Sequence, residues 1–241
     1  METYKIGTEK ITFYGKAKGS NKNKFNRVNK LASMYNELHS KLINIAERGY
    51  DSCTENYRCA VATILLMETG IRVGNEDSAE GYHTKPHPHA KDQTVKFVKT
   101  YGLTTLLKQH VKVKKDLVMF DFIGKKQVEN SYIVPKHLTK YIKQVALNNT
   151  EPIFGITDYQ LTKFIKRYVG KQFTPKDFRT LRANILAEQK ISNYDYPATK
   201  KEAKQIVKEV AEYVSSKLSN TPAVCKRSYI NEFLFTENLP L

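Results

Sequence analysis

The chain has 241 residues, 40% of them apolar, which is enough to bury a core and form a globular protein. Lysine and arginine total 40 against 24 aspartates and glutamates, and the resulting formal charge of +16 favours a polyanionic partner. No run of ~18 apolar residues could span a membrane, and the polar, acidic start is not typical of a signal peptide. We therefore expect a soluble intracellular protein without a membrane partner.

The first predicted elements are two short β-like runs at residues 4–6 and 11–14, followed by a basic segment that contains glycine. Two strands alone are marginally stable, so we expect residues 1–22 to be an arm and linker and not a domain. The lysines of this linker are predicted to contribute to binding the polyanionic partner. They are Lys16, Lys18, Lys22 and Lys24.

Two helices are predicted next. Apolar residues recur at helical spacing from residue 25 to residue 45, which indicates the first helix. Ser52 and Glu55 can form a capping box that opens the second helix, and Gly70 is expected to end it.

Residues 77–93 are predicted to form a loop insertion, because they combine glycine, two prolines and several charges. The three histidines of this loop could suggest a metal site, but no cysteine accompanies them, and we predict no metal. The cysteines of the chain lack metal-ligand spacing and are interpreted as free thiols. These residues are His83, His87 and His89, and Cys53, Cys59 and Cys225.

Three strands with short connections are predicted around residues 110–113, 117–123 and 128–134, which favours an antiparallel meander. Helices then return. Their starts are predicted at Thr157 or Asp158, at Thr174-Pro175, near Lys200 and at Thr221-Pro222. The expected fold is mainly α-helical and of the α+β class, with a small three-stranded antiparallel sheet and one domain over residues 23–241.

Four stretches of the sequence are distinctive: GIRVGNE at 70–76, FIGKKQV at 122–128, KDFRTLRAN at 176–184 and SNTPAVCKRSYI at 219–230. In order, spacing and local sequence they resemble the active-site segments of poxvirus and bacterial type IB DNA topoisomerases. The similarity covers roughly residues 11–233. It implies an enzyme that relaxes supercoiled double-stranded DNA through a 3′-phosphotyrosyl intermediate, in the cytoplasm or in a viral or phage replication setting, with residues 23–241 as its catalytic domain. The sequence gives no sign of oligomerisation, so we expect a monomer.

The chemistry explains why this family needs particular residue types. A phosphodiester under attack gathers negative charge on its nonbridging oxygens, and a guanidinium can bind two such oxygens at once. The resemblance assigns this task to Arg72 and Arg179. It assigns the nucleophile to Tyr229, whose phenol can bond to phosphorus and later leave.

The resemblance also assigns supporting residues. Lys125, at a predicted hairpin tip, would protonate the departing 5′ oxygen. Lys176 and Asn184 are expected to contact DNA. Asn220 stands where the poxviral branch has histidine, as in the bacterial branch, and can donate a hydrogen bond to a phosphate oxygen but cannot carry charge.

No nucleotide-binding loop of the G-x₄-G-K-[ST] kind and no carboxylate run typical of a two-metal nuclease occurs in the sequence, so we expect no cofactor. The main alternative function is a tyrosine recombinase or integrase, which shares this chemistry. Recombinases usually have a histidine at the position of Lys176, and this residue therefore favours a topoisomerase. A DNA-binding protein without catalysis is a third possibility, although each catalytic position holds a competent residue.

Poxviral and bacterial relatives carry a separate β-rich amino-terminal domain that closes over DNA. Only residues 1–22 precede the catalytic domain here. We therefore expect DNA binding to depend on the charge of the catalytic domain and of the linker lysines, and to weaken steeply with salt. The linker lysines are Lys16, Lys18, Lys22 and Lys24.

Overall fold

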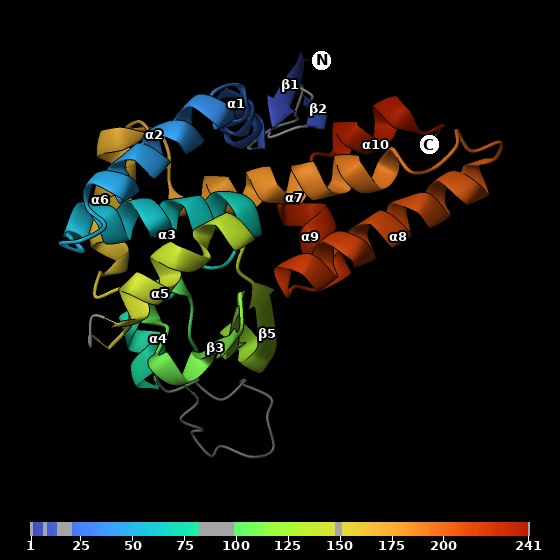
Figure 1. Ribbon diagram of the computed structural model, residues 1–241. Coiled ribbons are helices and arrows are strands. Elements are labelled where there is room, and N and C mark those ends of the chain that lie inside the picture. The colour runs from blue at the N-terminus through green and yellow to red at the C-terminus, as the bar shows by residue number, and fades with distance from the viewer. Residues whose placement is uncertain (1, 7–8, 14–20, 82–98, 148–150, 241) are drawn as a thin grey trace, which may run out of the picture. The chain divides into compact units, whose positions relative to one another are not determined.

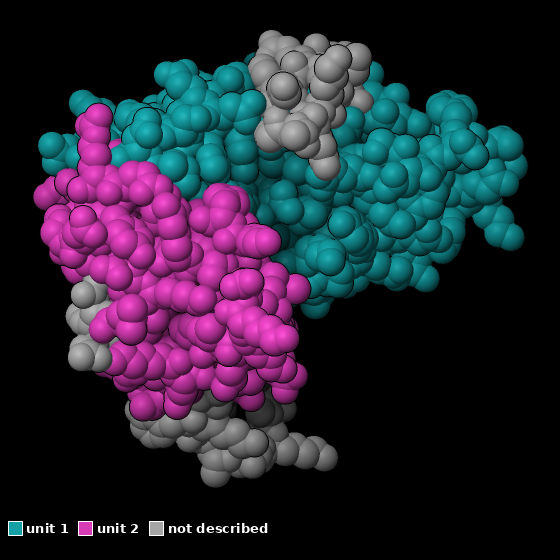
Figure 2. Space-filling model, in the orientation of Figure 1, with its two compact units in different colours: residues 1–44, 63–70, 165–241 teal, residues 45–62, 71–164 magenta. Residues whose placement is uncertain are grey.

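The computed structural model describes residues 2–6, 9–13, 21–81, 99–147 and 151–240. These residues are mainly helical, with a two-stranded and a three-stranded antiparallel sheet (Figure 1), which confirms the α+β class. The chain divides into two compact units, coloured separately in Figure 2. Unit 1 comprises residues 1–44, 63–70 and 165–241, and unit 2 comprises residues 45–62 and 71–164. The single domain over residues 23–241 stays a prediction.

Unit 1 is built mainly from helices. Its elements are β1 (Glu2–Ile6), β2 (Glu9–Phe13), α1 (Asn21–Ser33), most of α2 (Tyr35–Arg48), the end of α3 (Glu55–Thr69), the end of α6 (Asp158–Tyr168), α7 (Pro175–Ile191), α8 (Lys200–Leu218), α9 (Pro222–Ser228) and α10 (Glu232–Asn238). The two predicted amino-terminal strands are confirmed, and they pair with Tyr4 opposite Ile11. They are grouped with unit 1, and the arm over residues 1–22 stays a prediction.

The first predicted helix is in fact two helices, α1 and α2, with a break at Met34. The Ser33 hydroxyl donates a 2.8 Å hydrogen bond to the Lys30 carbonyl oxygen. A serine side chain that bonds to nearby backbone competes with the helical ladder, which accounts for an ending that the apolar spacing did not reveal.

The apolar core of unit 1 lies among α7 to α10. Along α8, Val207, Val210, Val214 and Leu218 are buried and recur every three or four residues. This spacing places them on one stripe of the helix, and each contributes roughly 1.5–3 kcal/mol by leaving water. The core thereby fixes the end of α8 and the start of α9, where the SNTPAVCKRSYI segment begins.

Helix α3 is buried almost throughout, because its residues from Cys59 to Met67 are fully shielded from solvent. Its start differs from the prediction, since the Tyr57 amide donates to the Thr54 hydroxyl at 3.2 Å and Ser52 lies outside the helix. Its end is as predicted, with Gly70 at φ +66°, a conformation that favours glycine.

Unit 2 contains the predicted meander. It contains the start of α3 and the greater part of α6. Its other elements are α4 (Glu76–Glu80), η1 (Leu103–Thr105), η2 (Lys108–His110), β3 (Val111–Lys114), β4 (Leu117–Gly124), η3 (Lys125–Gln127), β5 (Val128–Ile133), η4 (Lys136–Leu138) and α5 (Thr139–Leu147). The strand order is β3-β4-β5, all antiparallel, and Phe120 of β4 lies opposite Val111 and Tyr132. The sheet prediction is therefore confirmed.

The prediction of a loop at residues 77–93 is wrong for the first residues of this range, which belong to helix α4. The Asn75 side chain caps this helix by accepting from the Ser78 amide at 3.2 Å, and acidic Glu76 and Asp77 favour its amino end. The three histidines of the predicted loop lie outside the described residues.

The predicted starts of the later helices are confirmed. Thr157 accepts from the Gln160 amide at 3.1 Å, and Pro175 and Pro222 open α7 and α9 after threonine caps. Helix α10 was not predicted. The three cysteines are free and buried, as expected. Within the described ranges, none of the helices has the length and apolar character required to cross a membrane.

Candidate active site

Arg179 lies in the second turn of α7, as predicted, and only 3% of it is exposed. Its Nη1 donates to the Gly70 carbonyl oxygen, and its Nη2 donates to the Leu218 carbonyl oxygen. These carbonyls lie at the ends of α3 and α8, where helices carry partial negative charge. This buried cation belongs to the KDFRTLRAN segment. It binds the first residue of the GIRVGNE segment and the residue that precedes the SNTPAVCKRSYI segment.

Tyr229 lies directly after α9 as its carboxyl-terminal cap residue, with φ −125° and ψ −37°. The prediction that it lies on this helix is wrong by one residue. The Arg179 guanidinium carbon is 5.3 Å from the centre of the Tyr229 ring, within cation–π range. The tyrosine is half-buried, so a substrate can reach it beside a fixed positive charge.

Asn184 is buried, with 3% exposure, and its side chain is fully engaged inside unit 1. Its Nδ2 donates to the carbonyl oxygens of Tyr229 at 2.9 Å and Thr180 at 2.7 Å. Its Oδ1 accepts from the Asn231 amide at 2.9 Å. These bonds order the backbone around Tyr229, and the DNA contact of Asn184 stays a prediction.

The basic residues near this region differ in their surroundings. Lys176 is exposed in the first turn of α7. Lys24 is half-buried, and its Nζ donates to the Ser228 carbonyl oxygen at 3.1 Å. Burial, together with the positive charges of Lys176 and Arg27, lowers the pKa of Lys24.

The prediction that Lys22 and Lys24 lie in a linker is wrong, because helix α1 begins at Asn21 and includes both residues. Polar asparagines and lysines hid this first turn from the apolar spacing. Lys16 and Lys18 lie outside the described residues.

Asn220 follows Ser219, which ends α8 in a left-handed backbone conformation with φ +48°. Its amide donates to the Ser215 carbonyl oxygen at 3.0 Å, and its Nδ2 atom is buried. The residue is thus held between the end of α8 and Thr221, which caps α9 by accepting from the Val224 amide at 3.3 Å.

Arg72 belongs to unit 2, where it is half-buried in an extended stretch between α3 and α4. The backbone of this stretch is fixed by a second segment, because the Leu103 amide donates to the Arg72 carbonyl oxygen at 2.8 Å. A Cβ atom added at Gly102 would lie 2.4 Å from the Gly74 nitrogen, so the two backbones touch. The sequence analysis missed this support, although the glycine at each position was a signal of close approach.

Lys125 also belongs to unit 2 and is exposed in the connection between β4 and β5, as predicted. The next two residues, Lys126 and Gln127, have φ of +65° and +60°. Gly124 before it leaves room for Asn130, whose Nδ2 would lie 2.3 Å from an added Cβ and donates to the Val128 carbonyl oxygen. The hairpin tip is therefore braced at its base while the lysine extends into solvent.

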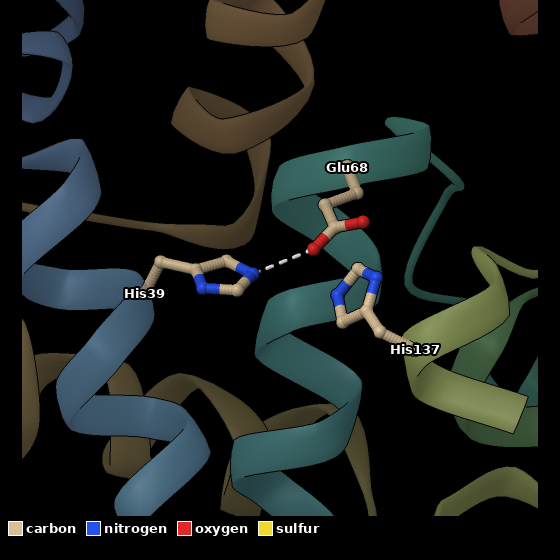
Figure 3. Close-up of side chains that lie close together, drawn as sticks. All are labelled: His39, Glu68 and His137. Atoms are coloured by element: carbon tan, nitrogen blue, oxygen red, sulfur yellow. Dashed lines mark hydrogen bonds and ion pairs between the residues drawn. The ribbon is translucent and has the colours of Figure 1, made fainter. Parts of the chain in front are cut away.

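Another polar pair lies within unit 1, between His39 of α2 and Glu68 of α3 (Figure 3). The His39 Nε2 and Glu68 Oε1 atoms are 2.7 Å apart. Glu68 stands two residues before Gly70, so this pair helps to hold the end of α3 where Gly70 accepts from Arg179. The prediction that the chain uses no metal is not tested by this pair and stays a prediction.

The residues predicted for catalysis therefore fall into two groups. Within unit 1, Arg179 and Tyr229 lie together, and Asn220 follows the helix end that Arg179 binds. Within unit 2, Arg72 and Lys125 lie on separate, well-supported backbone segments.

Comparisons with known proteins agree with the family resemblance. The family model described as eukaryotic DNA topoisomerase I, catalytic core, matches residues 15–233. The chain is 25% identical over 234 residues to DNA topoisomerase 1B of Acanthamoeba polyphaga mimivirus, covering 89% of this chain and 64% of that protein. It is 29% identical over 241 residues to DNA topoisomerase 1B of Vaccinia virus (strain Copenhagen), covering 90% of this chain and 65% of that protein.

The chain thus spans just under two thirds of the length of these relatives. Their names are those of topoisomerases, and the recombinase alternative is not favoured.

Proposed function

The chain belongs to the eukaryotic DNA topoisomerase I catalytic-core family, and from this premise we propose that it is a type IB topoisomerase of double-stranded DNA. The Tyr229 phenol oxygen bonds to a backbone phosphorus while the bond from phosphorus to the 5′ oxygen breaks. The DNA strand then has a free 5′ hydroxyl, and its 3′ phosphate is linked to the enzyme. After the duplex swivels, the hydroxyl attacks the same phosphorus and the phenol leaves.

The arginines stabilise the charge of the transition state. Arg179 retains capacity for a phosphate oxygen, since its buried Nε has no hydrogen-bond partner among residues of the described ranges. A buried donor left unsatisfied costs about 1–3 kcal/mol, and a phosphate oxygen would remove that cost. Arg72 supplies a second cation from a stretch whose backbone is fixed by Leu103.

Three further residues complete the proposed mechanism. Lys125, exposed at its hairpin tip, gives a proton to the departing 5′ oxygen. Asn220 donates a hydrogen bond from its side-chain amide to a nonbridging phosphate oxygen. This group is neutral and does not titrate. Exposed Lys176 contacts the DNA backbone. The enzyme acts as a monomer without metal, with Arg72 and Arg179 supplying the positive charge. It needs no nucleotide, because breaking and resealing the strand conserves the energy of the phosphodiester.

The observation that carries this proposal is the Arg179 guanidinium 5.3 Å from the Tyr229 ring centre, held there by two helix ends. The test is relaxation of supercoiled plasmid in the presence of a metal chelator. We expect the purified chain to relax the plasmid and Tyr229→Phe to bind DNA without relaxing it or forming a covalent complex.

Tyr196→Phe is the matched control, because Tyr196 is 73% exposed and should tolerate the same change. Relaxation by Tyr229→Phe at a rate near wild type would exclude the mechanism. Binding without relaxation by the wild-type chain would indicate a DNA-binding protein, and strand exchange between paired sites a recombinase.

A further inference from the structure

Helix α1 contacts the first turn of α7 through a partly buried ion pair. The Arg27 Nε and Nη2 donate to one oxygen of Asp177 at 3.1 and 3.0 Å, and Asp177 is 2% exposed. Its other oxygen accepts from the Thr174 amide and hydroxyl, both at 2.9 Å. Since every contact of this carboxylate lies at the start of α7 or on α1, the pair fixes α1 to the helix that carries Arg179.

Lys24 lies three residues before Arg27 and therefore one turn away on the same side of α1. Its ammonium donates to the Ser228 carbonyl oxygen at 3.1 Å, a normal hydrogen-bond length. This oxygen belongs to the peptide group between Ser228 and Tyr229. The same ammonium lies 4.3 Å from the centre of the Phe25 ring, which limits its freedom.

The placement of this ammonium is electrostatically unfavourable. Burial and the neighbouring cations Lys176 and Arg27 disfavour its charged form and lower its pKa. A surface lysine without a task would extend into water, away from other cations. The bond to the Ser228 carbonyl is the favourable contact that offsets this cost.

The backbone of Tyr229 is consequently held on both sides. Lys24 binds the carbonyl oxygen before the tyrosine, and Asn184 binds the carbonyl oxygen of the tyrosine itself at 2.9 Å. The amide of the same peptide group donates to the Cys225 carbonyl oxygen at 3.0 Å, a bond within the last turn of α9. Lys24 adds a contact from another helix, and without it this turn could shift and move the phenol with it. Attack on phosphorus requires alignment with the departing oxygen, and a misplacement of about 1 Å can slow a reaction by about 10².

We propose that Lys24 is a positioning residue for Tyr229, acting through the Ser228 carbonyl oxygen and not through DNA. The inference rests on the proposed function, because it concerns the attacking tyrosine. It assigns to α1 a part in the chemistry, since one face of this helix holds both the start of α7 and the peptide group of the nucleophile.

The test measures single-turnover cleavage and resealing of a labelled DNA duplex by the full chain. We expect Lys24→Met to slow both steps by the same factor, about 10- to 100-fold, because misalignment affects a transition state common to both directions. The ratio of cleaved to intact DNA at equilibrium should stay at the wild-type value. Lys24→Arg, which keeps a charged donor, should recover most of the rate.

The matched control is Lys30→Met, which removes the same charge from an exposed position on the same helix. Its DNA affinity should equal that of Lys24→Met. If Lys24→Met binds DNA more weakly than this control but cleaves at the wild-type rate when saturated, the residue is a DNA contact and the inference is overturned.

Three further outcomes are distinguishable. A folding defect lowers the fraction of active enzyme and hence the reaction amplitude, so reduced amplitude with a wild-type rate constant would also overturn the inference. A wild-type chain that forms no covalent DNA complex would overturn the proposed function itself. An active wild type with an equally fast Lys24→Met would overturn the positioning role alone.

Discussion

Arg179 has a structural task, and the proposed function adds a chemical one to the same side chain. Its two terminal nitrogens bind the carbonyls of Gly70 and Leu218, while the face of the guanidinium lies near the Tyr229 ring. A lysine could not replace it, because a single ammonium nitrogen lacks the planar fork that reaches two carbonyls.

We predict that Arg179→Lys slows single-turnover cleavage by about 10² or more, the scale of losing one transition-state donor. It should also lower the free energy of unfolding by about 1–3 kcal/mol, because a helix-end carbonyl loses its buried partner. Denaturant unfolding and cleavage kinetics check the two effects. Arg167→Lys, at an exposed position, is the control, and equal stability of the two variants would argue against the structural task.

The hydrogen bonds of Asn184 lie within unit 1. We predict that Asn184→Asp destabilises the fold by about 1–3 kcal/mol, because the two N–H donors to Thr180 and Tyr229 become acceptors that face carbonyl oxygens. Cleavage should slow while DNA affinity stays near wild type. A binding isotherm and a cleavage time course test this, and a large loss of affinity alone would support the DNA contact that the sequence predicted.

Lys125 is the candidate proton donor, and its role is separable from binding. For Lys125→Ala, we predict that a DNA substrate with sulfur in place of the departing 5′ oxygen restores much of the lost cleavage rate, because a thiolate leaves without a proton. Exposed Lys126 next to it provides the control variant. Without selective rescue, Lys176 would be the next residue to examine as the acid.

At the scale of elements, glycines allow separate segments to touch. The stretch that carries Arg72 is held by backbone bonds from Leu103 and Thr104, and Gly102 makes this approach possible. The atoms that a Cβ at Gly102 would meet are backbone atoms of Gly74 and Arg72, at 2.4 to 2.8 Å. Such atoms cannot move aside as a flexible side chain can.

We predict that Gly102→Ala costs about 1–3 kcal/mol in stability, as overpacking does, and displaces the Arg72 stretch so that cleavage slows. The stability cost of Gly124→Ala should have a different source, since the added Cβ would meet the side-chain amide nitrogen of Asn130 and not backbone atoms. Adding Asn130→Ala should relieve that clash. Thermal unfolding of the three variants tests the distinction, and a Gly102→Ala chain with unchanged stability would contradict the close packing.

At the scale of the whole molecule, we expect the charge of +16 to govern the proposed association with DNA more than the chemistry. Each phosphate neutralised by lysine or arginine releases a counterion, so affinity depends on salt. We predict a loss of about 10³ or more in affinity between roughly 50 and 200 mM salt if about six phosphates are neutralised.

Cleavage by enzyme already saturated with DNA should change far less, because the groups around Tyr229 are half-buried or buried. Titrations at several salt concentrations, paired with saturated single-turnover rates, separate binding from chemistry. An affinity that barely changes over this range would mean that nonionic contacts dominate the binding.

The sequence alone predicted the features that depend on near neighbours. Threonine followed by proline marked the starts of α7 and α9 correctly, because a cap and a fixed φ act within one turn. Short connections between apolar runs gave the order of the β3-β4-β5 sheet. The same local patterns missed the break at Met34 and the polar first turn of α1, where apolar spacing carries no signal.

Only the tertiary structure decided what Asn184 and Lys24 do. Asn184 binds the carbonyl of a residue 45 positions away, and Lys24 binds one 204 positions away. No local pattern can encode such a partner, because it depends on how buried helices pack. A lysine near the start of a basic chain therefore suggested a flexible DNA contact, whereas packing of α1 placed its ammonium against the peptide group that precedes Tyr229.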